Sequence, residues 1–297
     1  MRVSRVLRWI FVLAATMALL ALGYRRGVVA PMYAEALIEA VRAQDVLAVG
    51  RLLKRGADVN SRHFSNRWTA WLRTRTATPL HAAVRSGDPQ MVEFLLDHGA
   101  NPNGGDGWNA TPMMRSAAQG DFNIAKLLLA RGASINHRDA IGGTALTRAA
   151  AAGHLDVVKW LLQQGAEVNG EDRYHESSLS YAAKGKEPQR AEMVRLLLGV
   201  GAQTEGWALA NAVENGRAEI VRILVQHGAD VNGYGRSFRR LLSEAALQKD
   251  LPVVRALLDG GADVNARDGS GDTAATLALK AGSREVIAEL GAARVKP

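Results

Sequence analysis

The feature that most constrains this sequence is a segment that recurs every 33 residues. "TPLHAAVRSGDPQMVEFLLDHGANPN" runs from Thr78 to Asn103, and related segments start at Thr111 and Thr144. Each segment reads as two short apolar helices joined by a glycine turn. Because two helices of this length cannot bury their apolar faces alone, the fixed period predicts a stack in which each unit completes its neighbour's core.

Weaker copies extend this pattern over most of the chain. A first copy runs from Leu37 to Asn60, and later copies start at Ser177, Trp207, Arg240 and Thr273. Together they give about eight repeats in a domain that we place at residues 33–297.

Several motifs make the chain resemble ankyrin-repeat proteins. They are Thr78-Pro79-Leu80-His81, the stretch from Gly153 to Val158, and a Gly-Ala pair shortly before an Asn near the repeat ends. The resemblance covers almost everything after the first 32 residues. It implies an all-α repeat solenoid, a curved stack of helix pairs with β-turn fingers that binds other proteins. Few members of that family are enzymes.

The motif residues also have local physical roles. Thr78 can cap the first helix by accepting bonds from unpaired amide hydrogens, and Gly99 suits a left-handed helix end. Within the second helix, apolar side chains three and four positions apart predict one buried stripe. The predicted stripe consists of Val92, Leu95 and Leu96.

Residues 1–32 read as an export or anchor signal that precedes the fold, with an apolar helix from Trp9 to Tyr24. One alternative is a signal peptide cleaved near Ala21-Leu22-Gly23. The other is an uncleaved anchor, although sixteen helical residues span roughly 24 Å, less than the ~30 Å hydrocarbon core.

The flanking charges set the predicted location. Arg2, Arg5, Arg8 and the terminal amine outweigh Arg25 and Arg26, so the positive-inside rule places the repeats across the membrane. The preference for Arg over Lys and the Ala-rich composition resemble those of a GC-rich bacterium, which makes the far side the periplasm. We therefore expect the repeats on the periplasmic side of the inner membrane, with membrane contact through residues 9–24 if the signal is uncleaved. If the signal is cleaved, we expect the repeats in the soluble periplasm.

Composition excludes several classes of site. Hydrophobic residues make up 47% of the chain, which is ample for a core, and the absence of Cys excludes disulfides and thiol nucleophiles. The net charge is +8, and five of the positive residues precede the repeats. The charge is therefore weak evidence for nucleic-acid binding, and we expect no nucleic-acid partner.

One finger departs from the repeat. Between Asn60 and Thr78 it is ten residues longer than the finger between Asn103 and Thr111, and it contains no acid. Exposed Trp and Arg are enriched at binding hot spots, so we predict partner binding by four of its residues, Arg67, Trp68, Trp71 and Arg73. The alternative is a solvated loop whose Trp side chains fold back onto the first repeat.

A second candidate surface follows from the repeat register. The residue four positions after each helix cap, which we call the groove position, should face the concave groove; examples are Arg115, Arg148 and Tyr181. Finger residues Trp108 and Tyr174 should adjoin them. Aromatic side chains beside Arg suit an acidic protein segment, so we predict a protein partner that is acidic at the contact. The alternative is an ordinary solvated groove.

No catalytic or metal signal rises above background. The seven His residues are spread about one per repeat, which does not make a ligand cluster. We predict no catalytic residue, no cofactor and no metal. The leading hypothesis is an interaction scaffold in the bacterial envelope. The alternatives are a periplasmic immunity or inhibitor protein against a toxin, and, in another class, an envelope hydrolase.

Overall fold

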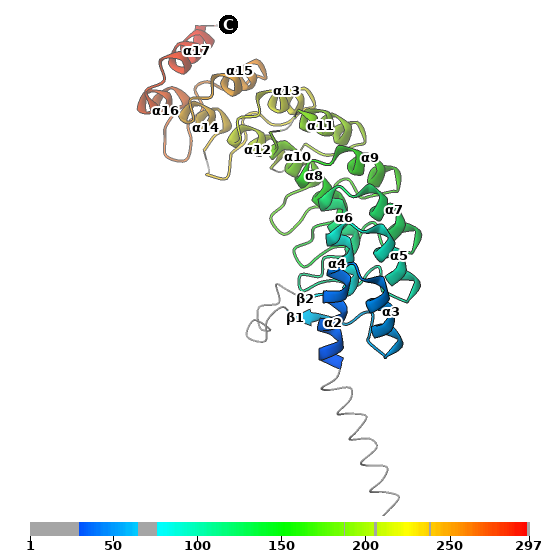
Figure 1. Cartoon of the computed structure of the whole chain (residues 1–297). Helices are drawn as coiled ribbons and strands as arrows, with labels where there is room; N and C mark the ends of the chain where they lie inside the picture. The colour runs from blue at the N-terminus through cyan, green and yellow to red at the C-terminus, as the bar shows by residue number, and fades with distance from the viewer. Residues whose placement is uncertain (1–29, 65–75, 187, 205–206, 238, 296–297) are drawn as a thin grey trace, which may run out of the picture. The chain divides into compact units, whose positions relative to one another are not determined.

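The structure of the protein is a computed structural model that describes residues 30–64, 76–186, 188–204, 207–237 and 239–295. Sixteen helices lie in these ranges and follow one another as pairs, which confirms the predicted all-α repeat solenoid (Figure 1). The helices are α2 (Ala30–Arg42), α3 (Val46–Lys54), α4 (Pro79–Ser86), α5 (Pro89–Asp97), α6 (Pro112–Gln119), α7 (Phe122–Ala130), α8 (Ala145–Ala152), α9 (Leu155–Gln163), α10 (Ser178–Lys184), α11 (Gln189–Gly199), α12 (Ala208–Glu214), α13 (Ala218–Gln226), α14 (Leu241–Leu247), α15 (Leu251–Asp259), α16 (Ala274–Ala281) and α17 (Arg284–Val295).

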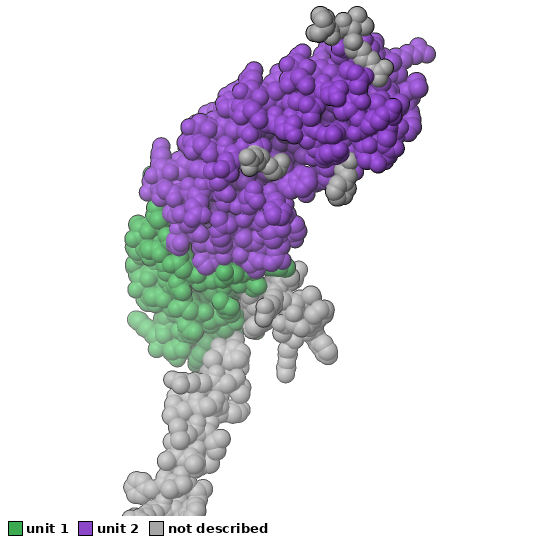
Figure 2. Space-filling model, turned by 180° about the vertical axis from the view of Figure 1, so that it is seen from behind, with its two compact units in different colours: residues 1–112, 126–133 green, residues 113–125, 134–297 purple. Residues whose placement is uncertain are grey.

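The chain divides into two compact units, which Figure 2 colours separately. Unit 1 comprises residues 1–112 and 126–133, and unit 2 comprises residues 113–125 and 134–297. In unit 2 the first helices of successive repeats pack in one layer, in the order α8, α10, α12, α14 and α16. The second helices α9, α11, α13, α15 and α17 form the other layer. Fully buried leucines such as Leu146 and Leu161 fill the core.

Helices α8 and α9 show why these short segments become helical. Thr144 and Thr147 form a reciprocal capping box at the start of α8, which satisfies amide groups that the helix itself cannot pair. Gly153 ends α8 in the left-handed conformation, with φ of 89°. That φ is strained for residues with a Cβ, so the backbone favours glycine at this turn.

The buried stripe of the second helix differs slightly from the predicted one. In α5 the fully buried residues are Met91, Val92 and Leu95, whereas Leu96 is only partly buried. The prediction was therefore wrong for Leu96. The stripe faces the first helix and the neighbouring repeat, and position 96 lies at its edge.

In several repeats, the Asn near the repeat end links its repeat to the next one. Asn169 Nδ2 donates to Gly201 O at 3.0 Å, and Asn169 Oδ1 accepts from Gln203 N at 3.0 Å. Asn60 makes the same two bonds to Gly99 O and Asn101 N within unit 1. These bonds satisfy turn groups that no helix pairs, which explains why Asn recurs with the Gly-Ala turn.

Twice, an arginine at the start of a second helix binds the C-terminal end of the first helix of the preceding repeat. Arg190 is 4% exposed and its guanidinium donates to Ala151 O at 2.9 Å and to Ala150 O, at the C-terminus of α8. Arg217 Nε donates to Lys184 O at 3.4 Å in the next repeat. A cation is favoured there because carbonyl dipoles leave negative charge at a helix C-terminus.

Only the base of the long finger belongs to the described residues. There strand β1 (His63–Phe64) pairs antiparallel with β2 (Thr76–Ala77). Among the described helices none is both long and apolar enough to cross a bilayer. The predicted apolar helix at residues 9–24 lies outside the described part of the chain.

Candidate partner-binding surface

An aspartate organises most of the described fingers. In the finger before α8, Asp139 Oδ1 accepts bonds from Ile141 N and Gly143 N, both at 2.9 Å. The side chain therefore holds the turn closed, as expected for an Asp that bonds the backbone two residues on. The same pattern occurs at Asp106, Asp172 and Asp268.

The finger aspartate also holds the groove position of its own repeat. Asp139, whose side chain is 1% exposed, accepts from the half-exposed guanidinium of Arg148. One repeat on, Tyr181 Oη donates to Asp172 Oδ2 at 2.7 Å. Burial and this hydrogen bond to the Asp172 carboxylate raise the pKa of the Tyr181 hydroxyl to about 12. Two successive repeats thus present fixed polar side chains at equivalent positions.

Other groove positions are not open to solvent, contrary to the expectation from register. Asn211 is 1% exposed and Leu277 is 5% exposed, so neither can contact a partner as the chain stands. For Asn211 the reason is a cover of charged side chains, which the sequence did not predict.

At the centre of this cover is Glu176, a buried carboxylate that is 1% exposed. It accepts from Lys184 Nζ at 2.6 Å, from Asn211 Nδ2 at 2.9 Å and from the guanidinium of Arg236. Three donors surround this carboxylate, and two of them are cations. Together they offset the cost of removing the carboxylate from water. Burial lowers the pKa of Lys184, and the charges of Asp172 and Glu214 oppose that shift.

Arg236 reaches Glu176 from the finger before α14, two repeats further along the chain. On the way its guanidinium lies over the ring of Trp207, 5.0 Å from the centroid, and its Nε lies 3.8 Å from Glu214 Oε2. Through this side chain, repeats five and seven make contact across repeat six.

The predicted site residues fall into three groups. One group, in unit 2, consists of Arg115, Arg148, Tyr174 and Tyr181. Tyr174 is 57% exposed, and the other three are partly buried. Trp108 lies in unit 1 and is 49% exposed. The four long-finger residues Arg67, Trp68, Trp71 and Arg73 lie outside the described residues. Partner binding by all nine stays a prediction.

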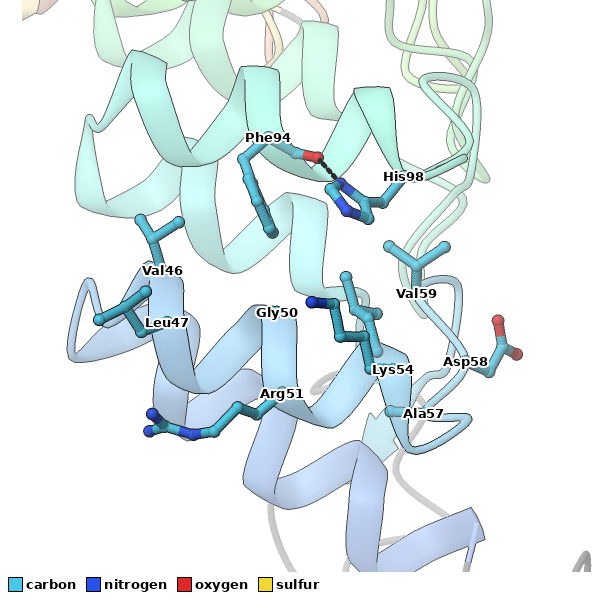
Figure 3. Close-up of a pocket in the computed structure, with 11 residues that line it drawn as sticks. Val46, Leu47, Gly50, Arg51, Lys54, Ala57, Asp58, Val59, Phe94 and His98 are labelled. Carbon is cyan, nitrogen blue, oxygen red and sulfur yellow. Dashed lines mark hydrogen bonds between the residues drawn. The ribbon is translucent and has the colours of Figure 1, made fainter.

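Unit 1 contains an apolar groove of about 750 Å³ between α3 and α5 that the sequence analysis missed. Figure 3 shows Val46 and Leu47 of α3 at one end, Phe94 of α5 over the middle, and His98, which follows α5, toward the other end. Leu47 is 75% exposed. Alignment of the repeats could have indicated this groove. The residue at the position of Leu47 is polar in most other second helices: Gln90, Asn123, Asp156, Glu192, Glu219 and Glu285.

On several second helices of unit 2, a charged residue pairs with one on the next second helix. Lys159 Nζ donates to Glu192 at 2.8 Å, and Arg195 donates to Glu219 at 2.9 Å. Gly50 of α3 stands at the position of Lys159 and Arg195, so α3 lacks this bond and leaves Phe94 accessible. Among the described residues, no group of three His, Cys, Asp or Glu side chains is arranged to hold a metal ion.

Comparison with known proteins identifies the repeat. A model described as "Ankyrin repeats (3 copies)" matches residues 37–139, 80–172 and 113–206. A model described as "Ankyrin repeat" matches residues 208–234, and one described as "Ankyrin repeats (many copies)" matches residues 242–288.

Similar segments occur in proteins of several kinds. The 2-5A-dependent ribonuclease of Mus musculus is 42% identical over 67 residues, which are 23% of this chain and 8% of that protein. The mitochondrial disaggregase of Bos taurus is 44% identical over 75 residues, 25% of this chain and 10% of that protein. Zygote-specific protein 3 of Chlamydomonas reinhardtii is 39% identical over 70 residues, 24% of this chain and 16% of that protein. This chain therefore matches only a small part of each relative. The family models, however, cover most of its own length. The chain belongs to the ankyrin-repeat family, whose repeats form a protein-interaction fold.

Proposed function

We propose that this chain is a non-catalytic scaffold of the bacterial envelope that binds an acidic segment of a partner protein. The observation that carries the proposal is the pair of groove residues Arg148 and Tyr181, each held by the finger aspartate of its own repeat. The charge of Arg148 also acts on Tyr181, so the two side chains are electrostatic neighbours.

This geometry favours a carboxylate ligand. A guanidinium has five N–H donors in a fixed plane, and Arg148 uses one nitrogen for Asp139 while its side chain stays 38% exposed. Because Asp139 already restrains the side chain, less conformational entropy is lost when a partner binds. A bidentate carboxylate would add charge-assisted bonds on the exposed side.

The neighbouring finger supplies an apolar contact. Tyr174 is 57% exposed, and its finger is joined to the preceding one because Arg173 N donates to Ile141 O at 2.7 Å and Arg173 Nη2 donates to Ala140 O at 2.5 Å. An aromatic side chain on a fixed backbone costs little entropy when it packs against a partner. Partner binding by Trp108, Arg115 and the long-finger residues Arg67, Trp68, Trp71 and Arg73 is proposed from the sequence alone.

The envelope part of the proposal rests on the Arg-flanked apolar run from Trp9 to Tyr24. A reporter that is active only in the periplasm, fused after Pro297, should be active. Activity from a cytoplasmic reporter alone would reject the location without touching the binding proposal.

The binding part is tested by substitution against the partner recovered from envelope fractions. Arg148→Ala should weaken binding by about 1–4 kcal/mol in calorimetric titration, because it removes the central cation. Arg222→Ala is the matched control, since Arg222 is exposed on the second helix α13. If the two variants bind alike, the groove assignment is wrong. A toxin as the recovered partner would favour the inhibitor role, and hydrolysis of generic envelope substrates by the purified chain would contradict the non-catalytic role.

A further inference from the structure

The apolar groove between α3 and α5 is open because of one glycine. Gly50 lies in the middle of α3, at a position that is charged in the second helices from α5 to α15: Glu93, Lys126, Lys159, Arg195, Arg222 and Arg255. A long side chain there would cross the joint between α3 and α5, as Lys159 crosses from α9 to α11. Both helices that border the groove are described and belong to unit 1, so the opening does not lie at an end of the stack.

The apolar lining of this groove is held in place. It includes Val46, Leu47, Val59 and Phe94. His98 Nδ1 donates to Phe94 O at 2.8 Å, and the centroids of the two rings are 4.2 Å apart (Figure 3). An aromatic side chain that is already restrained loses little entropy when a partner covers it. The groove therefore offers a preformed apolar contact.

The charge of the lining is positive. It contains two cations, Arg51 and Lys54, and one acid, Asp58. Figure 3 shows the amine of Lys54 pointing into the groove from the α3 side. Among the described residues neither cation forms an ion pair, while Asp58 Oδ1 accepts from Asn60 N at 2.9 Å within its own turn.

The carboxylates of α5 do not neutralise this charge, because both bind elsewhere. Glu93 accepts from Arg131 at 3.0 Å, and Asp97 accepts from Arg131 at 2.6 Å. Arg131 follows α7, so these bonds connect α5 to the repeat after it and not to α3. Lys54 and Arg51 are thus available to a carboxylate from outside the chain, and charge complementarity favours an acidic occupant over a basic one.

The two bordering helices decide which backbone fits. Each has nine residues, and its mid-helix amide and carbonyl groups already bond to each other. An extended segment would leave its own backbone groups unpaired against apolar side chains, whereas a helix pairs them internally and presents a side-chain face. A small ligand fits less well, since such sites bury about 70–90% of the ligand, and Leu47 in this lining is itself 75% exposed.

We propose that the groove between α3 and α5 binds an amphipathic helix of a partner protein, with apolar side chains over Phe94 and Leu47 and a carboxylate against Lys54. Leu47 and Lys54 are seven residues apart on α3, which is roughly 10 Å along a helix. A partner helix that lies along α3 therefore carries its carboxylate about two turns from its apolar anchor. This site is separate from Arg148 and does not depend on the function proposed above.

Selection from a display library of helical peptides tests the chemistry of the occupant. The bait is the full chain in nanodiscs of zwitterionic phospholipid. Peptides that bind empty nanodiscs, or the chain with Gly50→Lys, are removed. We expect the remaining peptides to share apolar residues three and four positions apart and a Glu or Asp about two turns away. Loss of all binders to the empty nanodiscs, no enrichment over the Gly50→Lys chain, or peptides that are basic or rich in Pro would each overturn the proposal.

Fluorescence anisotropy with the most enriched peptide measures the contribution of the open joint. Gly50→Lys should weaken binding at least about tenfold, because it fills the groove with the kind of side chain that other second helices carry. The variant should fold, since a Cβ on Gly50 would lie 3.6 Å from Phe94 Cζ and helices favour Lys over Gly. Gly199→Lys is the matched control at an exposed glycine at the end of α11, and it should bind like the unmodified chain.

A charge swap tests the carboxylate contact in the same assay. Lys54→Glu should weaken binding roughly three- to tenfold, and a peptide with Lys in place of its acid should recover that loss on the Lys54→Glu chain. Circular dichroism confirms that each variant is folded. Equal affinities for the Gly50→Lys and Gly199→Lys chains, or no recovery with the swapped peptide, would refute the proposal.

Discussion

Replacing Arg236 with Ala tests whether the long contact across repeat six stabilises unit 2. In a solenoid each repeat normally contacts only its neighbours, so unfolding spreads from one repeat to the next. Arg236 departs from that rule, because its guanidinium bonds to Glu176, sixty residues earlier in the chain. We expect Arg236→Ala to lower the free energy of unfolding of unit 2 and to reduce the cooperativity of its transition.

The expected loss of stability depends on which bonding partners each group keeps after the substitution. The Glu176 carboxylate loses one donor but retains Lys184 at 2.6 Å and Asn211 at 2.9 Å, so the about 3–5 kcal/mol cost of a stranded buried charge does not apply. Losing one bond to a charged group costs about 1.5–3 kcal/mol, and losing the guanidinium over Trp207 adds about 0.5–1 kcal/mol. Because the Arg236 side chain is 41% exposed and solvent screens it, we expect the lower part of this range, about 2–3 kcal/mol.

The assay is urea denaturation followed by circular dichroism. Arg222→Ala serves as the control, because it removes an exposed arginine from α13 and should change stability by less than about 0.5 kcal/mol. The double variant Glu176→Gln with Arg236→Ala should show a coupling energy of at least about 1 kcal/mol. If Arg236→Ala matches the control, or the coupling is zero within error, the contact does not stabilise the protein and our reasoning is wrong.

Four other predictions concern stability. Leu161→Ala removes a fully buried side chain and should cost about 2–5 kcal/mol in thermal or urea unfolding, whereas Leu162→Ala, at a partly buried site, should cost less. Gly153→Ala should destabilise by more than about 1 kcal/mol, because φ is 89° and the added Cβ would lie 3.0 Å from a guanidinium nitrogen. Gly199→Ala should instead stabilise by about 0.4–1 kcal/mol, since Gly199 is the last residue of α11, its φ is not positive, and open space surrounds it. The pKa of Tyr181 is raised from 10.0 to about 12, so its stabilising contribution is complete below pH 10.0 and is lost as pH rises to about 12. Tyr181→Phe should flatten the stability profile over that window, and an unchanged profile would contradict the bond to the finger carboxylate.

Local sequence rules predicted the parts of this fold that depend on near neighbours. Thr78 caps α4 by accepting from His81 N, and Gly99 adopts the left-handed conformation with φ of 84°. Both outcomes depend on residues within one turn of the chain, so the repeat pattern is enough to place them. The error at Leu96 lies at the edge of a stripe, where the choice between buried and partly buried depends on the neighbouring repeat.

The candidate site was less predictable. Alignment of the repeats gives the position of a residue within its repeat, but it does not give the side chains that surround that residue. Register placed Arg148 and Asn211 at equivalent positions, yet the structure leaves Arg148 half exposed and buries Asn211. The difference comes from Arg236, which no spacing rule connects with Glu176 or Asn211.

The sequence by itself therefore determined the family, the helix pairs, their caps and the order in which they stack, because each of these follows from local propensity and a fixed period. Only the tertiary structure decided which polar residues are covered and which apolar residues are left bare. Glu176 is buried because side chains from two other repeats reach it, and Leu279 is exposed because no described helix pair packs over it. Burial is a property of what lies next to a residue in space, and the same repeat position has different neighbours in different repeats.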